Sequence, residues 1–401
     1  MVGSARRRLP RAPQLAGRRS ITLAPVTFAA LALGGCAIVL GRVYGWTEIV
    51  TVGAFFLTLV VFAAVMTIGR TSYAVHLRLG EQDVRVGERA FGSVDVHNEG
   101  RRRVLPARIE MRVGHGRAEF AVPMLPAGGA HNELFAIPTR RRSVIIVGPV
   151  RSVRADPLGL IRREVTWTDQ QELYVHPVTV ALAGAAAGVI HDLEGQSRNT
   201  LSEDDMNFHA LREYVPGDDK RTIHWKSSAR AAKLMVRQFE DTRRTHTAVS
   251  LNVSPDAWTD EESFELGVAA LASFGLQVLR DAMDASLFAG TLTLRTVSPK
   301  ALLDDSSKIE LAPQNAPAED PAARIGQDAP YCSLAVVVTG GVAGPHELSA
   351  SAANVPAGVR TIFLRCQVGA ASSVTHSGQT SFATLGDLSE LGKVLRMAAA
   401  A

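Results

Sequence analysis

Residues 211–240 read LREYVPGDDKRTIHWKSSARAAKLMVRQFE, and this stretch separates two differently patterned halves of the chain. Its Pro-Gly pair is a turn signal, and the acids Asp218 and Asp219 after it suit the N-terminus of a short helix over residues 221–231. The alternating apolar residues of 233–239 predict a strand. The stretch therefore predicts a turn, a helix and a strand that join a β-rich region to an α/β region.

The same stretch is dense in charge, and three interpretations of it stay open. Because arginine pairs two carboxylate oxygens at once, a network of the two acids with Arg221 and Arg230 can fix the join between two domains. The second interpretation is a docking surface for a partner or a phosphate. The third is a hydrolase site that uses Asp218, Asp219 or His224, although no nucleophile or oxyanion arrangement accompanies these residues. The residues assigned to a partner-binding or structural site are Arg212, Tyr214, Pro216, Gly217, Asp218, Asp219, Arg221, His224, Trp225, Lys226, Ser228, Arg230 and Arg237.

Length and composition bound the organisation of the chain. Its 401 residues are enough for two or three domains, and its net charge is +4. Residues 1–20 hold six arginines and no acid, which predicts a basic cytoplasmic tail. The three cysteines, Cys36, Cys332 and Cys366, show neither CxxC spacing nor an even-numbered framework. We therefore expect no zinc site and no disulfide scaffold.

Residues 21–69 predict a membrane hairpin. The segments 21–41 and 49–69 contain no charged residue, and each has about the 20 residues that cross a bilayer core. The alternative is a lipoprotein signal ending at Cys36, but the apolar run continues past that residue and a second apolar segment follows. Because arginines flank the outer ends of the pair, the positive-inside rule places both termini in the cytoplasm.

Residues 70–180 predict an antiparallel β-sandwich, because short alternating segments are separated by turn residues. Two arginine triplets, 101–103 and 140–142, fall in its loops. They are typical of solvated loops, and near a membrane anchor they would contact anionic lipid headgroups. Residues 181–240 then form a linker and the charged stretch. The strands are expected at 84–86, 90–96, 107–113, 118–122, 133–137 and 144–147.

Residues 241–401 predict an α/β domain with a doubly wound sheet, because apolar strands alternate with helical segments. Residues 312–330 are rich in Ala, Pro and Asp and predict a mobile loop. The strands are expected at 247–253, 285–297, 333–339 and 359–365, and the helices at 261–283 and 385–398.

A signature similar to that of the domain of unknown function 58 (DUF58) family is formed by Arg212-x-Tyr214-x-Pro216-Gly217-Asp218-Asp219-x-Arg221-x-Ile223-His224-Trp225-Lys226-x-Ser228-Ala229-Arg230, followed by Leu234-x-Val236-Arg237. The upstream Gly148-Pro149-Val150 and Asp156-Pro157-Leu158-Gly159-Leu160 also resemble that family. The resemblance implies a von Willebrand factor A-like α/β domain. It also implies an accessory role beside a MoxR-type AAA+ ATPase and a transglutaminase-like membrane protein.

The resemblance also bears on metal binding. The von Willebrand factor A domain carries Asp-x-Ser-x-Ser after its first strand and binds a divalent metal there. This chain has Asn252, Ser254 and Asp256 at that position, so an amide replaces the first acid. Because Mg²⁺ prefers carboxylate oxygens, we expect no resident cofactor and at most weak Mg²⁺ binding.

The expected function is that of a membrane-anchored, non-enzymatic adaptor. Its expected partners are a MoxR-type AAA+ ATPase, a transglutaminase-like membrane protein and the lipid bilayer, with no nucleic acid. The alternative is the hydrolase that uses Asp218, Asp219 or His224.

Overall fold

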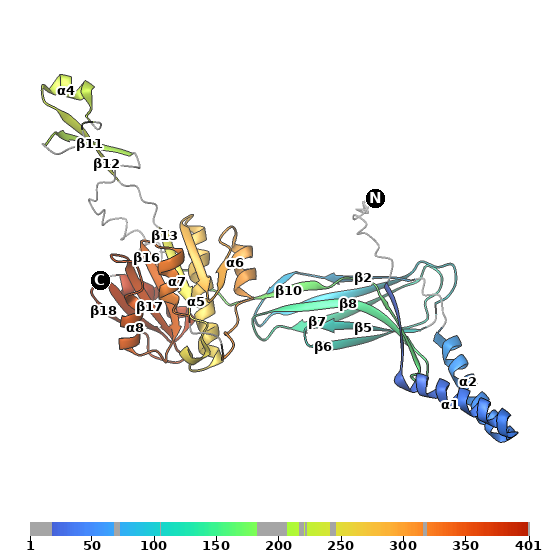
Figure 1. The fold of residues 1–401 in the computed structure, drawn as a ribbon. Helices are drawn as coiled ribbons and strands as arrows, with labels where there is room; N and C mark the ends of the chain where they lie inside the picture. The colour runs from blue at the N-terminus through green and yellow to red at the C-terminus, as the bar shows by residue number, and fades with distance from the viewer. Residues whose placement is uncertain are drawn as a thin grey trace, which may run out of the picture. The chain divides into compact units, whose positions relative to one another are not determined.

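The computed structural model describes residues 18–67, 73–104, 106–182, 207–215, 220, 223–240, 246–315 and 319–399. The chain divides into two units, Met1–His176 and Pro177–Ala401 (Figure 1). It is a mixed α/β protein with several sheets and two apolar helices near its N-terminus. Each unit is described by itself below.

The two apolar helices, α1 (Pro25–Tyr44) and α2 (Thr47–Thr67), are long and apolar enough to span a membrane. They pack closely where two glycines meet, because a Cβ atom on Gly53 would lie 2.7 Å from the backbone oxygen of Gly34. A third helix, α5 (Glu261–Arg280), is equally long, but 72% of its apolar window is buried. We therefore assign α5 to the core of the second unit.

The first helix begins later than the sequence predicts. Residues Arg18–Leu23 form strand β1, which pairs antiparallel with β9 (Ile161–Thr166). The helix then starts at Pro25, where a proline suits the first turn because its missing N–H has no helical partner. Part of the segment expected as tail and span is thus a strand of the first unit.

Two sheets of the first unit enclose one apolar core. The larger has the order β1-β9-β8-β10-β3, with β5 and β6 joined to it through β8, and the smaller has the order β2-β4-β7. Pairing is antiparallel except between β10 and β3. Strands β2 and β10 were not predicted. The remaining bounds are β2 Tyr73–Leu79, β3 Asp83–Arg85, β4 Arg89–Asn98, β5 Ala107–Val113, β6 Gly116–Val122, β7 Ala130–Pro138, β8 Ser143–Ala155 and β10 Gln171–His176.

The second unit holds a seven-stranded sheet in the order β15-β14-β13-β16-β17-β19-β18. Strands β14, β13, β16, β17 and β19 are parallel, and the edge strands β15 and β18 are antiparallel. The strand bounds are β13 His246–Leu251, β14 Asp284–Ala289, β15 Leu292–Leu294, β16 Leu334–Gly340, β17 Arg360–Cys366, β18 Ser373–Ser377 and β19 Thr380–Leu385.

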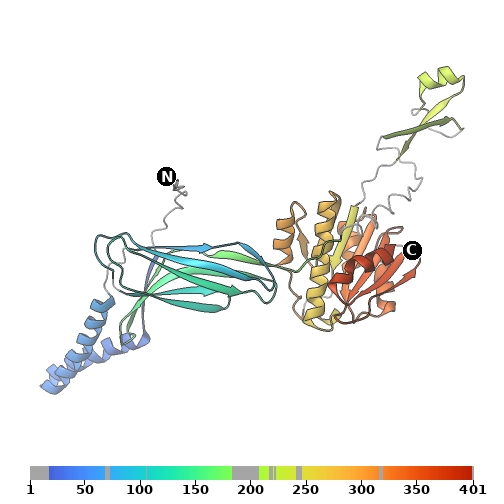
Figure 2. The same cartoon turned by 180° about the vertical axis from the view of Figure 1, so that it is seen from behind.

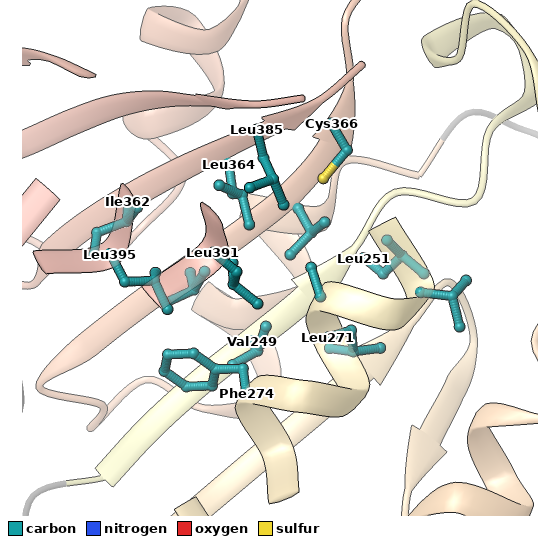
Figure 3. Close-up of a cluster of buried hydrophobic side chains, with 14 of the residues drawn as sticks. Val249, Leu251, Leu271, Phe274, Ile362, Leu364, Cys366, Leu385, Leu391 and Leu395 are labelled. Carbon is teal, nitrogen blue, oxygen red and sulfur yellow. The ribbon is translucent and has the colours of Figure 1, made fainter. Parts of the chain in front are cut away.

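Helices cover both faces of this sheet, as a doubly wound fold requires. On one face, Leu271 and Phe274 of α5 pack in a common core with Ile362 and Leu364 of β17 (Figure 3). Cys366 lies in the same core, and burial raises the pKa of its thiol. Helices α6 (Pro299–Ser306) and α9 (Leu391–Ala399) join this face, and α7 (Pro321–Asp328) and α8 (Pro345–Ala352) cover the other.

Several predicted elements of this unit differ from the structure. The expected strand 285–297 is the hairpin of β14 and β15, because the chain turns at Gly290 with a positive φ of 53°. The expected loop 312–330 contains α7, which the Asp320 side chain caps by accepting from Ala322 N. The expected helix 385–398 is shorter, since β19 ends at Leu385 and α9 begins at Leu391.

An ion pair between the buried carboxylate of Asp305 and the exposed guanidinium of Arg295 fixes α6 to the end of β15. The carboxylate of Asp305 accepts from Arg295 Nε at 2.7 Å, from Arg295 Nη2 at 2.8 Å and from the Arg295 backbone N at 3.1 Å. Burial opposes the ionisation of Asp305, but the hydrogen bonds and positive charge of Arg295 outweigh it. The pKa of Asp305 is therefore lowered from its usual value.

We expect Asp305→Asn to lower the free energy of unfolding by about 1–3 kcal/mol at pH 7, because the variant loses a charge-assisted pair. Since the folded pKa is depressed, the contribution of the carboxylate is complete above the unfolded value near 3.8 and is lost as pH falls through the folded pKa. Chemical denaturation at neutral and acidic pH should show the gap to wild type narrowing in acid. Glu310→Gln, at an exposed position, is the control. A gap that is equal at both pH values would contradict this account.

Candidate functional site

The charged signature stretch forms a small antiparallel hairpin with a helix between its strands. Strand β11 (Asn207–Glu213) pairs with β12 (Met235–Glu240), with an irregularity between Phe208 and Ala210. An isolated bridge between Ile223 and Val236 adds a third segment beside β12. The predicted strand at 233–239 is thus present as β12, paired with a strand that precedes the signature.

The helix of this hairpin is α4 (Trp225–Ala231). The sequence predicted a longer helix over 221–231 with an acidic residue at its N-terminus. His224 caps α4, because His224 Nδ1 accepts from Ser227 N at 3.3 Å. The backbone N of His224 already donates to Met235 O at 2.8 Å, so this residue belongs to the segment beside β12. The helix therefore begins only at Trp225.

A buried hydroxyl holds α4 against β12. Ser228 Oγ donates to His224 O at 3.1 Å and accepts from Met235 N at 2.8 Å, so one side chain joins the helix to the strand. On the outside, Lys233 Nζ lies 3.2 Å from Glu213 Oε1, and both side chains are exposed. Ser228 therefore has a structural role, and His224 uses one ring nitrogen for capping.

The other signature residues divide into exposed, partly buried and undescribed positions. Trp225 is 67% exposed, and Lys226 and Arg230 are also exposed. Tyr214 is half-buried, and its backbone N donates to Leu234 O at 2.8 Å. Arg212, also half-buried, donates to Glu213 O at 3.2 Å.

The predicted network of the two acids with arginine falls largely on positions that the structure does not describe, and it stays a prediction. For Arg237 only the strand backbone is described. The signature positions outside the described residues are Pro216, Gly217, Asp218, Asp219 and Arg221.

A second candidate site is a cavity of about 470 Å³ at the carboxyl edge of the seven-stranded sheet. It lies at the ends of β13 and β16, neighbouring strands from which the chain continues to opposite edges of the sheet. Ligands bind at such a switch point in open α/β sheets. Its lining includes four carboxylates and, among the residues that the structure describes, no Lys, Arg or His. The acidic residues that line it are Asp256, Glu319, Asp320 and Glu347.

The metal-site candidates Asn252, Ser254 and Asp256 all line this cavity. Asn252 Oδ1 accepts from Ser254 N at 2.9 Å, and Asn252 Nδ2 lies 3.3 Å from Thr339 Oγ1. The amide NH₂ thereby joins the end of β13 to β16, while the amide oxygen holds the turn that follows β13. The trio supplies one carboxylate, and no cluster of three or more His, Cys, Asp or Glu suited to a metal occurs in the described part of the chain. The donor set therefore fits Mg²⁺ poorly.

Two features that the sequence did not reveal shape this cavity. Asp320 caps α7 and also accepts from Ser351 Oγ and Asn354 Nδ2, each at 2.6 Å, so it binds α7 to α8. Gly340 ends β16 where a Cβ atom would lie 2.1 Å from Ala257 O, so only glycine fits there. The Asp-Pro pair at 320–321, a helix-start signal, was the available sign of this helix.

Comparison with solved structures gives no support for a fold assignment. A CARDB domain of Pyrococcus furiosus aligns at 13% identity over 26% of this chain and 91% of its own, with a TM-score of 0.20. The alkylpurine DNA glycosylase AlkC of Pseudomonas fluorescens, bound to DNA, aligns at 12% identity over 37% of this chain and 46% of its own, with a TM-score of 0.21. Scores this low carry no argument.

Sequence comparison is more informative. The uncharacterized protein YeaD of Bacillus subtilis (strain 168) is 29% identical over 141 residues, which are 34% of each chain. The match thus spans about a third of that relative. The model of the family "Protein of unknown function DUF58" matches residues 210–299, from the signature hairpin to the start of α6. The segment that contains the signature is therefore of the DUF58 type, a family of uncharacterized proteins.

Proposed function

We propose that this protein is a membrane-anchored, non-enzymatic adaptor that binds protein partners in the assembly or maturation of a client complex. The observation that carries the proposal is the combination in one chain of two apolar helices with an α/β unit whose sheet edge holds an open cavity. In that cavity, Asn252 and Asp320 are engaged in hydrogen bonds that hold the fold together. Such an arrangement suits binding better than turnover.

The α/β unit is proposed to be a von Willebrand factor A-like domain. The strand order, with an antiparallel edge strand beside β14 and a cavity at the ends of β13 and β16, supports this interpretation. No resident cofactor is proposed, because Asn252 stands where a metal site needs an acid. Calorimetric titration of the detergent-solubilised full chain with Mg²⁺ should give no binding tighter than about the millimolar range, whereas micromolar binding would contradict the proposal.

The proposed partner of the signature hairpin is a MoxR-type AAA+ ATPase, with a transglutaminase-like membrane protein as a second partner. This proposal is supported by the surface of the hairpin. Trp225 is exposed there beside Lys226, and Arg230 lies on the same short helix. Tryptophan and arginine are the residues that most often dominate the energy of protein interfaces. Nucleic acid is not a proposed partner.

We expect Trp225→Ala to weaken capture of the ATPase about tenfold, as truncation of a central interface tryptophan does. The full chain, solubilised from its native membrane in mild detergent, would be purified and its co-purifying proteins quantified by mass spectrometry. Tyr331→Ala is the matched control, because Tyr331 is an aromatic residue exposed at 88% outside the hairpin. Recovery of no AAA+ ATPase by wild type, or equal recovery by Trp225→Ala, would contradict the assignment.

Both termini are proposed to be cytoplasmic. The support is the arginine-rich sequence before α1 and the short connection between α1 and α2, which carries few charges. Reporter fusions at the C-terminus should show cytoplasmic activity, and the same reporters inserted after Gly45 should show the opposite location. A periplasmic signal from the C-terminal fusion would overturn this topology.

A further inference from the structure

Helices α1 and α2 are joined to the β-rich part of the first unit at one of its ends. Strand β2 begins at Tyr73 opposite Asn98, where β4 ends. Strand β5 begins at Ala107 opposite Val122, where β6 ends, and the same part of β5 pairs with the end of β8. Helices α1 and α2 leave from this end (Figure 1, Figure 2). The loops at this end are 99–104, 123–129 and 156–160.

Direct contacts join this end to the start of α1 and the end of α2. Leu160 O accepts from Ala24 N at 3.0 Å and from Thr27 Oγ1 at 2.5 Å. Near the C-terminal end of α2, Ala63 packs against Leu160 and Ile161. Because α1 begins at Pro25 and α2 ends at Thr67, the loop 156–160 lies beside the end of the helix pair that joins the β-rich unit.

A buried amide gives the loop 99–104 a fixed shape. Asn98 Nδ2 donates to Arg102 O at 2.9 Å, to Pro126 O at 2.8 Å and to Leu125 O at 3.2 Å, and Asn98 Oδ1 accepts from Gly100 N at 2.9 Å. The bridge between Val104 and Leu125 continues the connection. One side chain thus ties two loops of this end together.

This loop carries the arginine triplet 101–103. From the sequence alone, this triplet had the same interpretation as the triplet 140–142. Arg101, Arg102 and Arg103 are exposed, and their guanidinium groups form no ion pair with the residues that the structure describes. The triplet 140–142 precedes β8 at the opposite end of the unit. The 13 residues of β8 extend over roughly 43 Å at about 3.3 Å per residue, far beyond a Debye length.

Apolar side chains accompany the arginines at this end. Leu158 is 54% exposed in the loop between β8 and β9, and Met124 is 50% exposed in the loop between β6 and β7. Exposed apolar side chains next to exposed arginines are typical of surfaces that lie in the interface of an anionic membrane. By contrast, Arg142 at the far end is only 8% exposed.

We propose that the loops 99–104, 123–129 and 156–160 form a membrane-docking surface. Arg101, Arg102 and Arg103 bind the phosphate groups of anionic lipids in the leaflet from which the hairpin emerges, while Leu158 and Met124 lie at the boundary of the acyl chains. The occupant follows from continuity, because the same end of the unit is joined to both membrane helices. Docking of these loops rests on the proposed membrane anchor and requires no protein partner.

The test is arginine footprinting of the full chain in nanodiscs, with phenylglyoxal and peptide mass spectrometry. In nanodiscs with about 30% phosphatidylglycerol, modification of Arg101, Arg102 and Arg103 should be about threefold or more slower than in neutral phosphatidylcholine nanodiscs. Arg140 and Arg141, exposed at the far end, are controls within the same molecule and should react equally in both. The protection should disappear at about 0.5 M salt.

A second measurement tests the apolar contact. Leu158→Cys in a Cys36→Ala background takes a fluorophore at one site, since Cys332 and Cys366 are buried. Doxyl-labelled lipids should quench this fluorophore, and should quench it less when Arg101, Arg102 and Arg103 are all Gln. The proposal would be overturned if Arg101, Arg102 and Arg103 reacted at the same rate in both nanodiscs, or if Arg140 and Arg141 were protected to the same extent. It would also be overturned if inorganic phosphate gave the same protection in neutral nanodiscs, or if doxyl-labelled lipids did not quench the fluorophore.

Discussion

The antiparallel pairing of β1 with β9 is the constraint on which the first unit depends. Its register runs from Arg18 opposite Thr166 to Leu23 opposite Ile161, and only Ala24 separates β1 from α1. An apolar helix that follows a strand so directly cannot move freely against the sheet that holds that strand. The hydrogen bonds of Leu160 O extend the ladder to the first turn of α1. The start of α1 is therefore fixed to one end of the β-rich unit.

A comparable constraint organises the cavity of the second unit. A carboxylate at position 252 would suit a cation, whereas the amide accepts from Ser254 N and offers its NH₂ to Thr339. At position 252, a carboxylate would favour cation binding, whereas the amide favours the contact between the strand ends. Gly340 completes the arrangement, because β16 must pass close to the backbone at Ala257. Asp320 is likewise engaged in hydrogen bonds with Ser351 and Asn354, which leaves Asp256, Glu319 and Glu347 as the carboxylates available to a ligand.

The sequence predicted elements wherever one physical signal dominated. The apolar runs that became α1, α2, β13 and β16 had no competing pattern. Prediction was wrong where two signals overlapped. The strand β1 was hidden because Ile21 and Leu23 continue an apolar run, and α7 was hidden because its Ala and Pro composition masked the Asp320 cap. The capping by His224 depends on a backbone bond to Met235, a contact between segments that no local pattern reports.

The same limit explains the two arginine triplets, which look alike as sequence and differ in the fold. Only strand register reveals that one triplet lies at the end of the unit where the two apolar helices are joined, and that the other lies a full length of β8 away. Charge is likewise divided in the second unit, where the cavity is lined by acids while Lys226 and Arg230 of α4 are exposed cations. An acidic cavity disfavours phosphate-bearing ligands and favours a basic group.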